Sequence, residues 1–243
     1  MIVNIVPTAG QAVEHDLSRG AAVVIDVLRA TSTVVTALAH GAAGVYPAES
    51  PEAAHKLREE LSPDRVLLGG ERESVRLPGF DLGNSPLEYT PGVVAGRHVI
   101  LCTTNGTGAM LAVRSARRGV AAALLNLPAV ARALATEDAV TILCAGTKGS
   151  VSLEDTIAAG GLIAHWQGMD VDVTTDDFGF VALGAYEAAR SDLAGWLSRS
   201  RNGQRLLHLG LHADIDWCAR LGAVDIVPVV RHDPGGRVYF GLV

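Results

Sequence analysis

The stretch VVIDVLRATST, residues 23–33, sets the pattern for the whole 243-residue chain. The apolar run at residues 22–25 is short, β-branched and uninterrupted, which predicts a buried strand that stops at the carboxylate of Asp26. Apolar residues recur at helical spacing over residues 34–39, so a helix is expected directly after this turn. The stretch is therefore typical of a strand-to-helix unit of an α/β protein.

The turn inside this stretch brings together residues that suit a phosphate and a metal ion. Arg29 follows Asp26 by three positions, and Thr31, Ser32 and Thr33 offer hydroxyls that can cap the expected helix. Free N–H groups and the helix dipole attract an anion, while a carboxylate can hold a cation. The alternative is an ordinary turn, in which Asp26 caps the helix and Arg29 is a solvated surface charge.

Strands and helices alternate along the rest of the chain, and a terminal hairpin is expected around DPGG at residues 233–236. This order predicts a three-layer α/β/α sandwich with a mixed, mostly parallel sheet. We expect a single domain over residues 1–243, and two closely packed α/β lobes are the alternative arrangement. Strands are expected at residues 2–6, 45–46, 65–68, 98–102, 120–124 and 139–144, and helices at 51–61, 109–116, 129–135, 153–166 and within 176–221.

Small polar or charged residues follow three more of the expected strands, in GGER at residues 69–72, TTNGTG at 103–108 and AGTKGS at 145–150. In open α/β sheets ligands bind beyond the carboxyl ends of the strands. We therefore expect these turns and the turn at Asp26 to converge on one site. The motif GxxxxGK[ST] is absent from the chain, which disfavours nucleotide binding of the P-loop type.

The loop at residues 77–92 has no periodicity and contains several prolines and glycines. Loops of this length inside compact domains are usually functional. Asn84 and Ser85 are its candidate binding residues.

Acidic residues in two expected helices are further candidates. Glu154 and Asp155 stand at the start of the helix at residues 153–166, where first-turn acids also stabilise a helix dipole without any further role. His212 and Asp216 lie four residues apart on one helix face. That spacing can bind a metal, but we interpret the two as a plain surface pair.

Composition excludes several classes of protein. The formal net charge is −6 and the basic residues are scattered apart from a short cluster at 114–118, so nucleic acid is not an expected partner. The three cysteines include no CxxC pair, which indicates reduced thiols rather than disulfides or a zinc site. A signal peptide and a membrane span are not expected, because no apolar run is long enough. We expect a soluble, cytoplasmic protein.

Taken together, these motifs resemble the 2-phosphosulfolactate phosphatase (ComB) family, a family of magnesium-dependent phosphatases. The resemblance spans nearly the whole chain in the same order. It implies hydrolysis of (2R)-O-phospho-3-sulfolactate to sulfolactate and phosphate, a step of coenzyme M biosynthesis. The segments that carry it are IDVLRATST (25–33), GGER (69–72), GFDLGNSP (79–86), TTNGT (103–107), CAG (144–146), LEDTIAAG (153–160) and HADIDWCARL (212–221).

Phosphomonoester hydrolysis needs stabilisation of a dianion, a cation and a nucleophile, and Mg²⁺ prefers oxygen ligands. We expect Asp26 to be a Mg²⁺ ligand or the nucleophile, and Arg29 to clamp the phosphate. Glu71, Glu154 and Asp155 are further metal or base candidates, with Asp26, Arg29 and Glu71 forming the expected catalytic set. The expected binding groups for phosphate and for a second acid group are Thr31, Ser32, Arg72, Asn84, Ser85, Thr103, Thr104, Asn105, Gly106 and Lys148.

Two other functions compete with this expectation. The chain can be a phosphatase of another small phosphorylated hydroxy acid, or a non-catalytic anion-binding protein on the same scaffold. Its oligomeric state is open, although symmetric homodimers are common among enzymes of this size.

Overall fold

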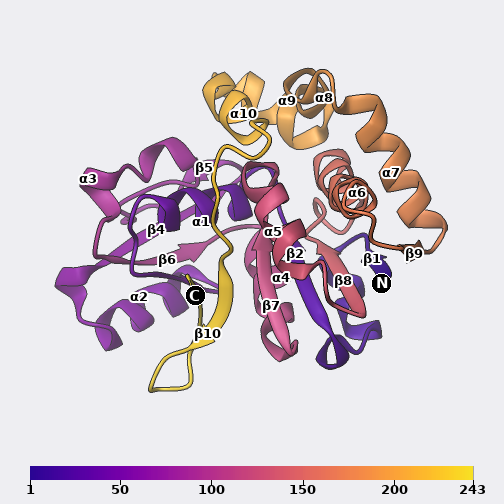
Figure 1. Cartoon of the computed structure of the whole chain (residues 1–243). Coiled ribbons are helices and arrows are strands. Elements are labelled where there is room, and N and C mark those ends of the chain that lie inside the picture. The colour runs from indigo at the N-terminus through magenta and orange to yellow at the C-terminus, as the bar shows by residue number, and fades with distance from the viewer. Residues whose placement is uncertain (243) are drawn as a thin grey trace.

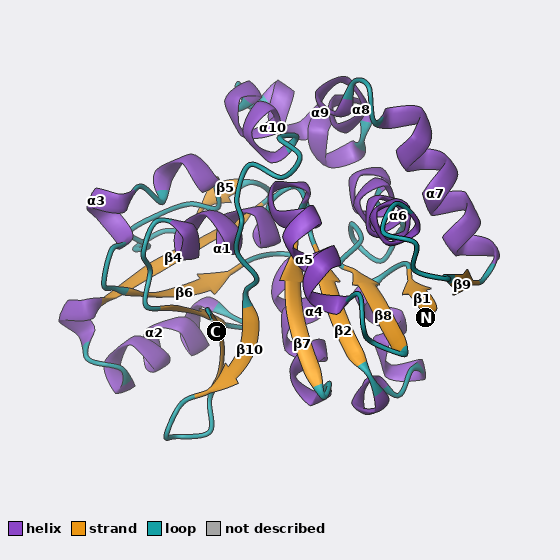
Figure 2. Cartoon of the chain, in the orientation of Figure 1, coloured by secondary structure: helices purple, strands orange, loops and turns teal. Residues whose placement is uncertain are grey.

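The computed structural model describes residues 1–242, and Val243, the last residue of the expected domain, lies outside the described residues. Figure 1 and Figure 2 show a mixed sheet, most of whose neighbouring strands are parallel, with helices on both of its faces. The expected three-layer α/β/α architecture is therefore confirmed.

The strands form one sheet in the order β5-β4-β6-β3-β11-β10-β7-β2-β8-β1-β9. Two parallel groups, β4-β6-β3 and β7-β2-β8-β1-β9, are joined by the antiparallel hairpin β10-β11. Their bounds are β1 (Ile2–Val6), β2 (Ala21–Ile25), β3 (Gly44–Pro47), β4 (Val66–Arg72), β5 (Val75–Arg76), β6 (His98–Cys102), β7 (Arg118–Ala122), β8 (Ala139–Cys144), β9 (Thr174–Thr175), β10 (Val229–His232) and β11 (Val238–Gly241).

Strand β2 lies inside the larger parallel group and is buried on both faces. Val23 and Ile25 join one hydrophobic cluster, whereas Ala22 and Val24 join another on the opposite side. This two-sided burial explains why the strand reads as a continuous apolar run rather than an alternating one. Ile25, its last residue, is level with the last residues of both neighbouring strands, β7 and β8. The chain segments that follow β2 and β8 therefore begin side by side.

The helices cover this sheet in three places. One face of β7-β2-β8-β1 packs against α5 and α6, whereas α1 and α4 share a second core with strands of both parallel groups, and α2 covers β4 and β6. Their bounds are α1 (Ala30–Ala39), α2 (Pro51–Glu60), α3 (Pro91–Val94), α4 (Gly106–Ala112), α5 (Leu127–Leu134), α6 (Leu153–Gln167), α7 (Asp177–Ala189), α8 (Leu193–Arg199), α9 (Arg201–His208) and α10 (His212–Cys218). In Figure 1, α8, α9 and α10 lie above the carboxyl ends of β7 and β2.

Several element boundaries differ from expectation, among them two helix starts beside the site. Helix α1 begins at Ala30 rather than after Thr33, and α4 begins at Gly106 rather than at residue 109. Thr31, Ser32 and Thr33, taken for the turn, already belong to the first turn of α1, and residues 106–108 of the second turn already belong to α4. The reason at α1 is that the main-chain oxygen of Asp26 accepts from the Thr31 N–H at 3.0 Å, so the chain turns immediately after β2.

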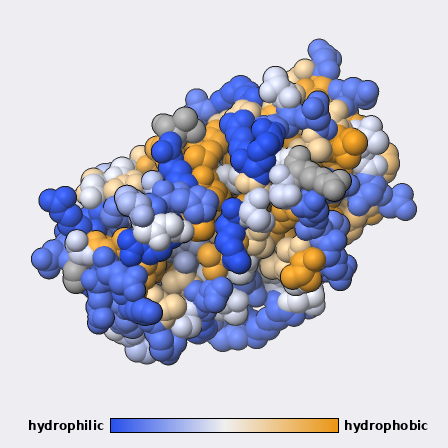
Figure 3. Space-filling model, turned by 90° about the horizontal axis from the view of Figure 1, so that it is seen from below, coloured by the Kyte–Doolittle hydropathy of each residue, from blue (hydrophilic) through white to orange (hydrophobic). Residues whose placement is uncertain are grey.

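Figure 3 shows the molecule from below, where apolar side chains lie in patches between hydrophilic ones. Among exposed large apolar side chains, Phe180 and Val181 on α7 are 65% and 61% exposed. None of the helices within residues 1–242 combines the length and the apolar composition that crossing a membrane requires.

We predict that Gly160 is essential for the packing of α6 against α7. A Cβ atom at this position would lie 1.9 Å from the main-chain oxygen of Ala182, and that backbone cannot move without shifting the whole helix. Gly160→Ala should lower the free energy of unfolding by about 1–3 kcal/mol, measured by urea denaturation. Gly184 is the matched control, because a Cβ there meets nothing within 4 Å, and Gly184→Ala should stabilise by about 0.4–1 kcal/mol. Equal effects of the two substitutions would contradict the prediction.

Candidate active site

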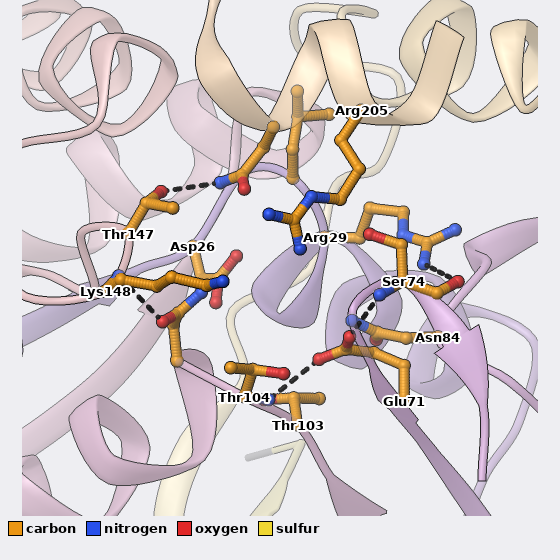
Figure 4. A pocket seen from close by; sticks show the side chains of 13 residues that line it. Asp26, Arg29, Glu71, Ser74, Asn84, Thr103, Thr104, Thr147, Lys148 and Arg205 are labelled. Atoms are coloured by element: carbon orange, nitrogen blue, oxygen red, sulfur yellow. Dashed lines mark hydrogen bonds between the residues drawn. The ribbon is translucent and has the colours of Figure 1, made fainter. Parts of the chain in front are cut away.

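A small polar pocket, partly open to solvent, lies where the two parallel groups of strands meet. Segments that follow β2, β4, β6 and β8 contribute to its wall, together with one loop and helix α9 (Figure 4). The lining residues are Asp26, Leu28, Arg29, Glu71, Ser74, Asn84, Thr103, Thr104, Asn105, Thr147, Lys148, Asn202 and Arg205. The expected convergence of the strand-end turns is therefore present in the structure.

Asp26 directly follows the central strand β2 and is buried, with 7% of the residue exposed. Its Oδ1 accepts a hydrogen bond from the Ala30 N–H at 3.2 Å, as a helix-capping side chain does. Its Oδ2 faces the first turn of α4, because a Cβ atom at Gly106 would lie only 2.4 Å from it. Gly106 thus lets the turn after β6 reach the carboxylate, although its own atoms do not line the pocket.

The charge of Asp26 is unfavourable in the folded protein without a bound cation. Burial, assisted by repulsion from Glu154 and Glu71, raises the pKa of Asp26 to about 7, against the opposing Ala30 hydrogen bond and the Arg29 charge. Burial also raises the pKa of Glu154. Buried like charges of this kind persist only where something compensates them, which is typical of sites that bind a cation or transfer a proton.

Asp155 holds two strand ends together. Its Oδ1 accepts from the Val27 N–H after β2 at 2.9 Å, and its Oδ2 accepts from the Gly146 N–H after β8 at 3.1 Å. Burial, then repulsion from Glu154 and Asp26, raises the pKa of Asp155 well above its usual range. Both of its oxygens are engaged by the backbone, and the side chain does not line the pocket.

Glu71 lines the pocket from the opposite side, at the end of β4. Its Oε1 accepts from the Thr104 N–H and its Oε2 from the Ser74 N–H, both at 2.7 Å. These two bonds join the turn after β6 to the turn between β4 and β5 (Figure 4). The geometry shows Glu71 organising the two turns through its hydrogen bonds.

Arg29 is buried and oriented by a residue far away in sequence. Its Nη1 pairs with Asp214 Oδ2 at 2.5 Å, and its Nη2 donates to the Ser74 main-chain oxygen at 3.3 Å (Figure 4). Asp214, on α10, is 2% exposed and also accepts from Ser85 Oγ at 2.6 Å. Ser85 is therefore engaged with Asp214 and does not line the pocket.

His212 and Asp216 on α10 are both exposed, as expected for a surface pair. Asp214, between them, is the buried functional candidate that the sequence reasoning missed. The sequence feature that could have identified Asp214 is its position on the apolar side of the helix. It is next to Ile215 and four residues before Cys218, and both of these residues are buried.

Three other expected binding residues also lie outside the pocket wall. The hydroxyls of Thr31 and Ser32 are fully buried and donate to the main-chain oxygens of Asp26 and Val27, so they stabilise the turn from beneath. Arg72 points to the other side of β4, where Nη2 donates to Cys102 Sγ at 3.5 Å. Successive side chains of a strand point to opposite faces, which explains why Glu71 faces the pocket and Arg72 does not.

Asn84 is the residue most clearly prepared for a ligand. It is 5% exposed and lines the pocket, and its buried Oδ1 has no hydrogen-bond partner within the described chain. Buried polar atoms are normally paired, so an unpaired one in a pocket wall indicates a position that a ligand completes. The loop at residues 77–92 thus supplies one pocket residue, as its irregular composition suggested.

Helix α9 supplies pocket residues that the sequence reasoning did not identify. Asn202 Nδ2 donates to Thr147 Oγ1 at 2.8 Å and to Glu154 Oε1 at 2.7 Å, which links α9 to the floor of the site. Figure 4 shows the Arg205 guanidinium reaching down from α9 into the pocket. No motif marked these residues, because they lie on a helix rather than at a strand end.

The cation-binding capacity of the site rests on few side chains. Over residues 1–242, no group of three or more His, Cys, Asp or Glu side chains is close enough to hold a metal ion. The remaining oxygen donors are the Asp26 carboxylate, which Glu154 is close enough to repel, and the unpaired Asn84 Oδ1 elsewhere in the wall. Such a set suits a hard cation that keeps several water ligands, as Mg²⁺ does.

The chemistry available is therefore that of an anion-binding site with one desolvated carboxylate. Lys148, Arg205 and Arg29 bring positive charge to a concave wall, and the turn at residues 103–105 adds hydroxyl and amide groups. A phosphate monoester placed there would meet cations on several sides and a nucleophile or metal-binding carboxylate on another. The fold and the pocket thus favour phosphoryl chemistry.

Comparisons with known proteins agree with this interpretation. A sequence model of the family described as 2-phosphosulpholactate phosphatase matches residues 7–233. The chain is 47% identical over 230 residues to the probable 2-phosphosulfolactate phosphatase of Symbiobacterium thermophilum, covering 94% of this chain and 96% of that protein. It is 46% identical over 226 residues to the protein of the same name from Deinococcus radiodurans, covering 91% of each.

We predict that Asp26→Asn stabilises the metal-free protein, and increasingly so as the pH rises. The folded wild type binds the Asp26 proton more tightly than the unfolded chain, so this contribution to stability is present below about pH 4 and lost as the pH rises through about 7. At about 1.36 kcal/mol per pKa unit, the advantage of Asp26→Asn at pH 8 approaches roughly 4 kcal/mol. Thermal unfolding in EDTA at several pH values measures it. A stability difference that does not change with pH would contradict the prediction.

A second prediction concerns the buried ion pair between Arg29 and Asp214. Asp214→Asn leaves a buried guanidinium without its counter-charge, so the free energy of unfolding should fall by about 3–5 kcal/mol. Asp216→Asn, two residues away on an exposed position of the same helix, should stay within about 0.5 kcal/mol of the wild type. Urea denaturation of both variants measures the difference. Equal stability of the two would show that the pair is not a structural constraint.

Proposed function

Because the chain belongs to the 2-phosphosulpholactate phosphatase family, we propose that it is a phosphoric monoester hydrolase acting on (2R)-O-phospho-3-sulfolactate, with sulfolactate and phosphate as products. The observation that carries the proposal is the buried Asp26 carboxylate in a pocket whose wall also contains Arg29, Lys148 and Arg205. We further propose that the enzyme is cytoplasmic and acts in coenzyme M biosynthesis.

Mg²⁺ is the proposed cofactor, and the donor set supports it. Asp26 is the best-placed ligand, because both Glu71 and Asp155 direct their two oxygens at backbone N–H groups. Glu154 is close enough to repel Asp26, and Asn84 offers an unpaired oxygen. When bound, Mg²⁺ would neutralise phosphate charge and keep Asp26 ionised at neutral pH.

The residues of the chain would bind and orient the phosphate ester. The Thr103–Asn105 turn and Lys148 face the pocket together, because the Lys148 N–H donates to Asn105 Oδ1 at 3.1 Å. Arg29 is held rigidly by Asp214 and Ser74, so its remaining N–H groups are pre-oriented for an anion at little further cost in entropy. Helix α9 would add Asn202 and Arg205 to the binding groups, because both line the pocket.

Asp26 has two possible roles within the proposal. As nucleophile, its Oδ2 would attack phosphorus, the ester oxygen would leave with a proton, and water would later release phosphate from the aspartyl phosphate. As metal ligand, it would instead position the cation beside an attacking water. Trapping a phosphoenzyme on Asp26 distinguishes the two.

We predict that Asp26→Asn lowers phosphate release from phosphosulfolactate at least about a hundredfold, because either role needs the carboxylate. Asp216→Asn, an exposed carboxylate on α10, should keep wild-type activity. EDTA should abolish release and Mg²⁺ should restore it, measured with a phosphate-release assay.

The same assay separates the competing functions. Faster release from another phosphorylated hydroxy acid would replace the substrate and keep the reaction class. Binding of phosphosulfolactate without release in the presence of Mg²⁺ would show a non-catalytic anion-binding protein.

A further inference from the structure

A charged turn of the chain extends to the mouth of the pocket. Strands β4 and β5 are joined by the two residues Glu73 and Ser74, whose φ angles are 55° and 66°. Both central residues of a type I′ hairpin turn have positive φ, and glycine or asparagine is preferred there. Neither residue is of that kind, so this backbone is held in a costly conformation, as turns at functional sites often are.

The backbone of this turn is anchored to the site on both sides. The Ser74 N–H donates to Glu71 Oε2 at 2.7 Å, and the Ser74 main-chain oxygen accepts from Arg29 Nη2 at 3.3 Å. The Glu73 side chain, in contrast, is 59% exposed. The backbone of the turn is therefore fixed, whereas the Glu73 carboxylate is exposed to solvent.

That carboxylate binds two cations that come from two other elements. Glu73 Oε1 accepts from Lys148 Nζ at 2.7 Å, and Glu73 Oε2 pairs with Arg205 Nη1. Lys148 lies in the loop after β8 and Arg205 on α9, and both line the pocket, whereas Glu73 does not. The hydrogen bond from Lys148 also holds the pKa of Glu73 below its usual range, so this carboxylate is ionised.

We propose that Glu73 is a built-in counter-anion that occupies Lys148 and Arg205 until the substrate arrives. The second acid group of the substrate, a carboxylate or a sulfonate, would displace Glu73 and take over the two cations, while the phosphate lies beside Asp26. This inference rests on the proposed function, and it deepens it by assigning the site for the non-phosphate acid group. Lys148 and Arg205 are then specificity residues, and Glu73 sets the affinity.

The exchange is feasible because the ion pairs are weak. Exposed ion pairs contribute little to stability, and here the Lys148 and Arg205 side chains are 51% and 26% exposed. Glu73 already displaces part of the water around the two cations. The free-energy cost of desolvating them when the substrate binds is therefore smaller. Only the Glu73 side chain must turn away, since Ser74 keeps the backbone in place.

The test compares variants on two substrates. Glu73→Gln removes the competing charge at constant size, so KM for phosphosulfolactate should fall about two- to tenfold. Isopropyl phosphate has the same ester position but no second acid group, and kcat/KM for it should not change. Glu187→Gln, which removes an exposed carboxylate paired with Arg190 on α7, is the matched control and should leave both values unchanged.

A second background tests whether the effect passes through the two cations. In Lys148→Met/Arg205→Met, KM for phosphosulfolactate should rise, and adding Glu73→Gln should then have no effect, because its partners are gone. An unchanged or higher KM in Glu73→Gln alone would overturn the proposal. Equal gains for phosphosulfolactate and isopropyl phosphate would also overturn it, since the cations would then serve the phosphate itself.

Failure of the proposed function would be recognised separately. If the wild type releases no phosphate from phosphosulfolactate, the dissociation constant of phosphosulfolactate is measured by calorimetry for the wild type and Glu73→Gln. Tighter binding to Glu73→Gln would support the counter-anion role without the reaction. Equal binding, or none to either protein, would overturn it.

Discussion

Asp26 places a desolvated carboxylate at the carboxyl end of the central strand β2, and the architecture of the site follows from the need to tolerate it. Its capping bond from Ala30 starts helix α1, and its free side requires a glycine at position 106, where α4 begins. The neighbouring Glu154 and Glu71 carboxylates make its ionisation costly. A protein keeps such a group where a ligand or cation supplies the missing stabilisation, which is the general reason that active sites reduce stability.

Three other buried carboxylates hold parts of the site together: two bind backbone N–H groups of separate segments, and one binds Arg29. Asp155 ties the segment after β2 to the segment after β8, Glu71 ties the turn after β6 to the β4–β5 turn, and Asp214 holds Arg29. Each one accepts two hydrogen bonds, at least one of them across a long sequence separation. The site is thereby assembled from loops that have little regular structure of their own, yet are fixed relative to one another.

The two parallel groups of strands explain why the residues that line the pocket are far apart in the sequence. The hairpin β10-β11 joins the groups through single register pairs to β7 and β3, so their carboxyl ends face a common centre without forming one continuous parallel sheet. Segments after β4 and β6 approach from one group, and segments after β2 and β8 from the other. Helix α9 closes the remaining side with Arg205, whose charge is held by Glu73.

The sequence by itself determined the α/β class, the order of elements and the strand ends that carry polar residues, because period, strand length and turn composition are local properties. Asp26, Glu71, Asn84 and Lys148 could be selected in that way, and the family could be inferred from the ordered motifs. The tertiary structure alone decided which of two neighbouring side chains reaches the site. Glu71 faces the pocket and Arg72 does not, since a strand alternates its faces. Asp214, rather than His212 or Asp216, is buried and holds Arg29, since helix burial selects one side. It also decided that Arg205 and Asn202 belong to the site, because packing of α9 across the strand ends is a long-range contact that no local pattern records.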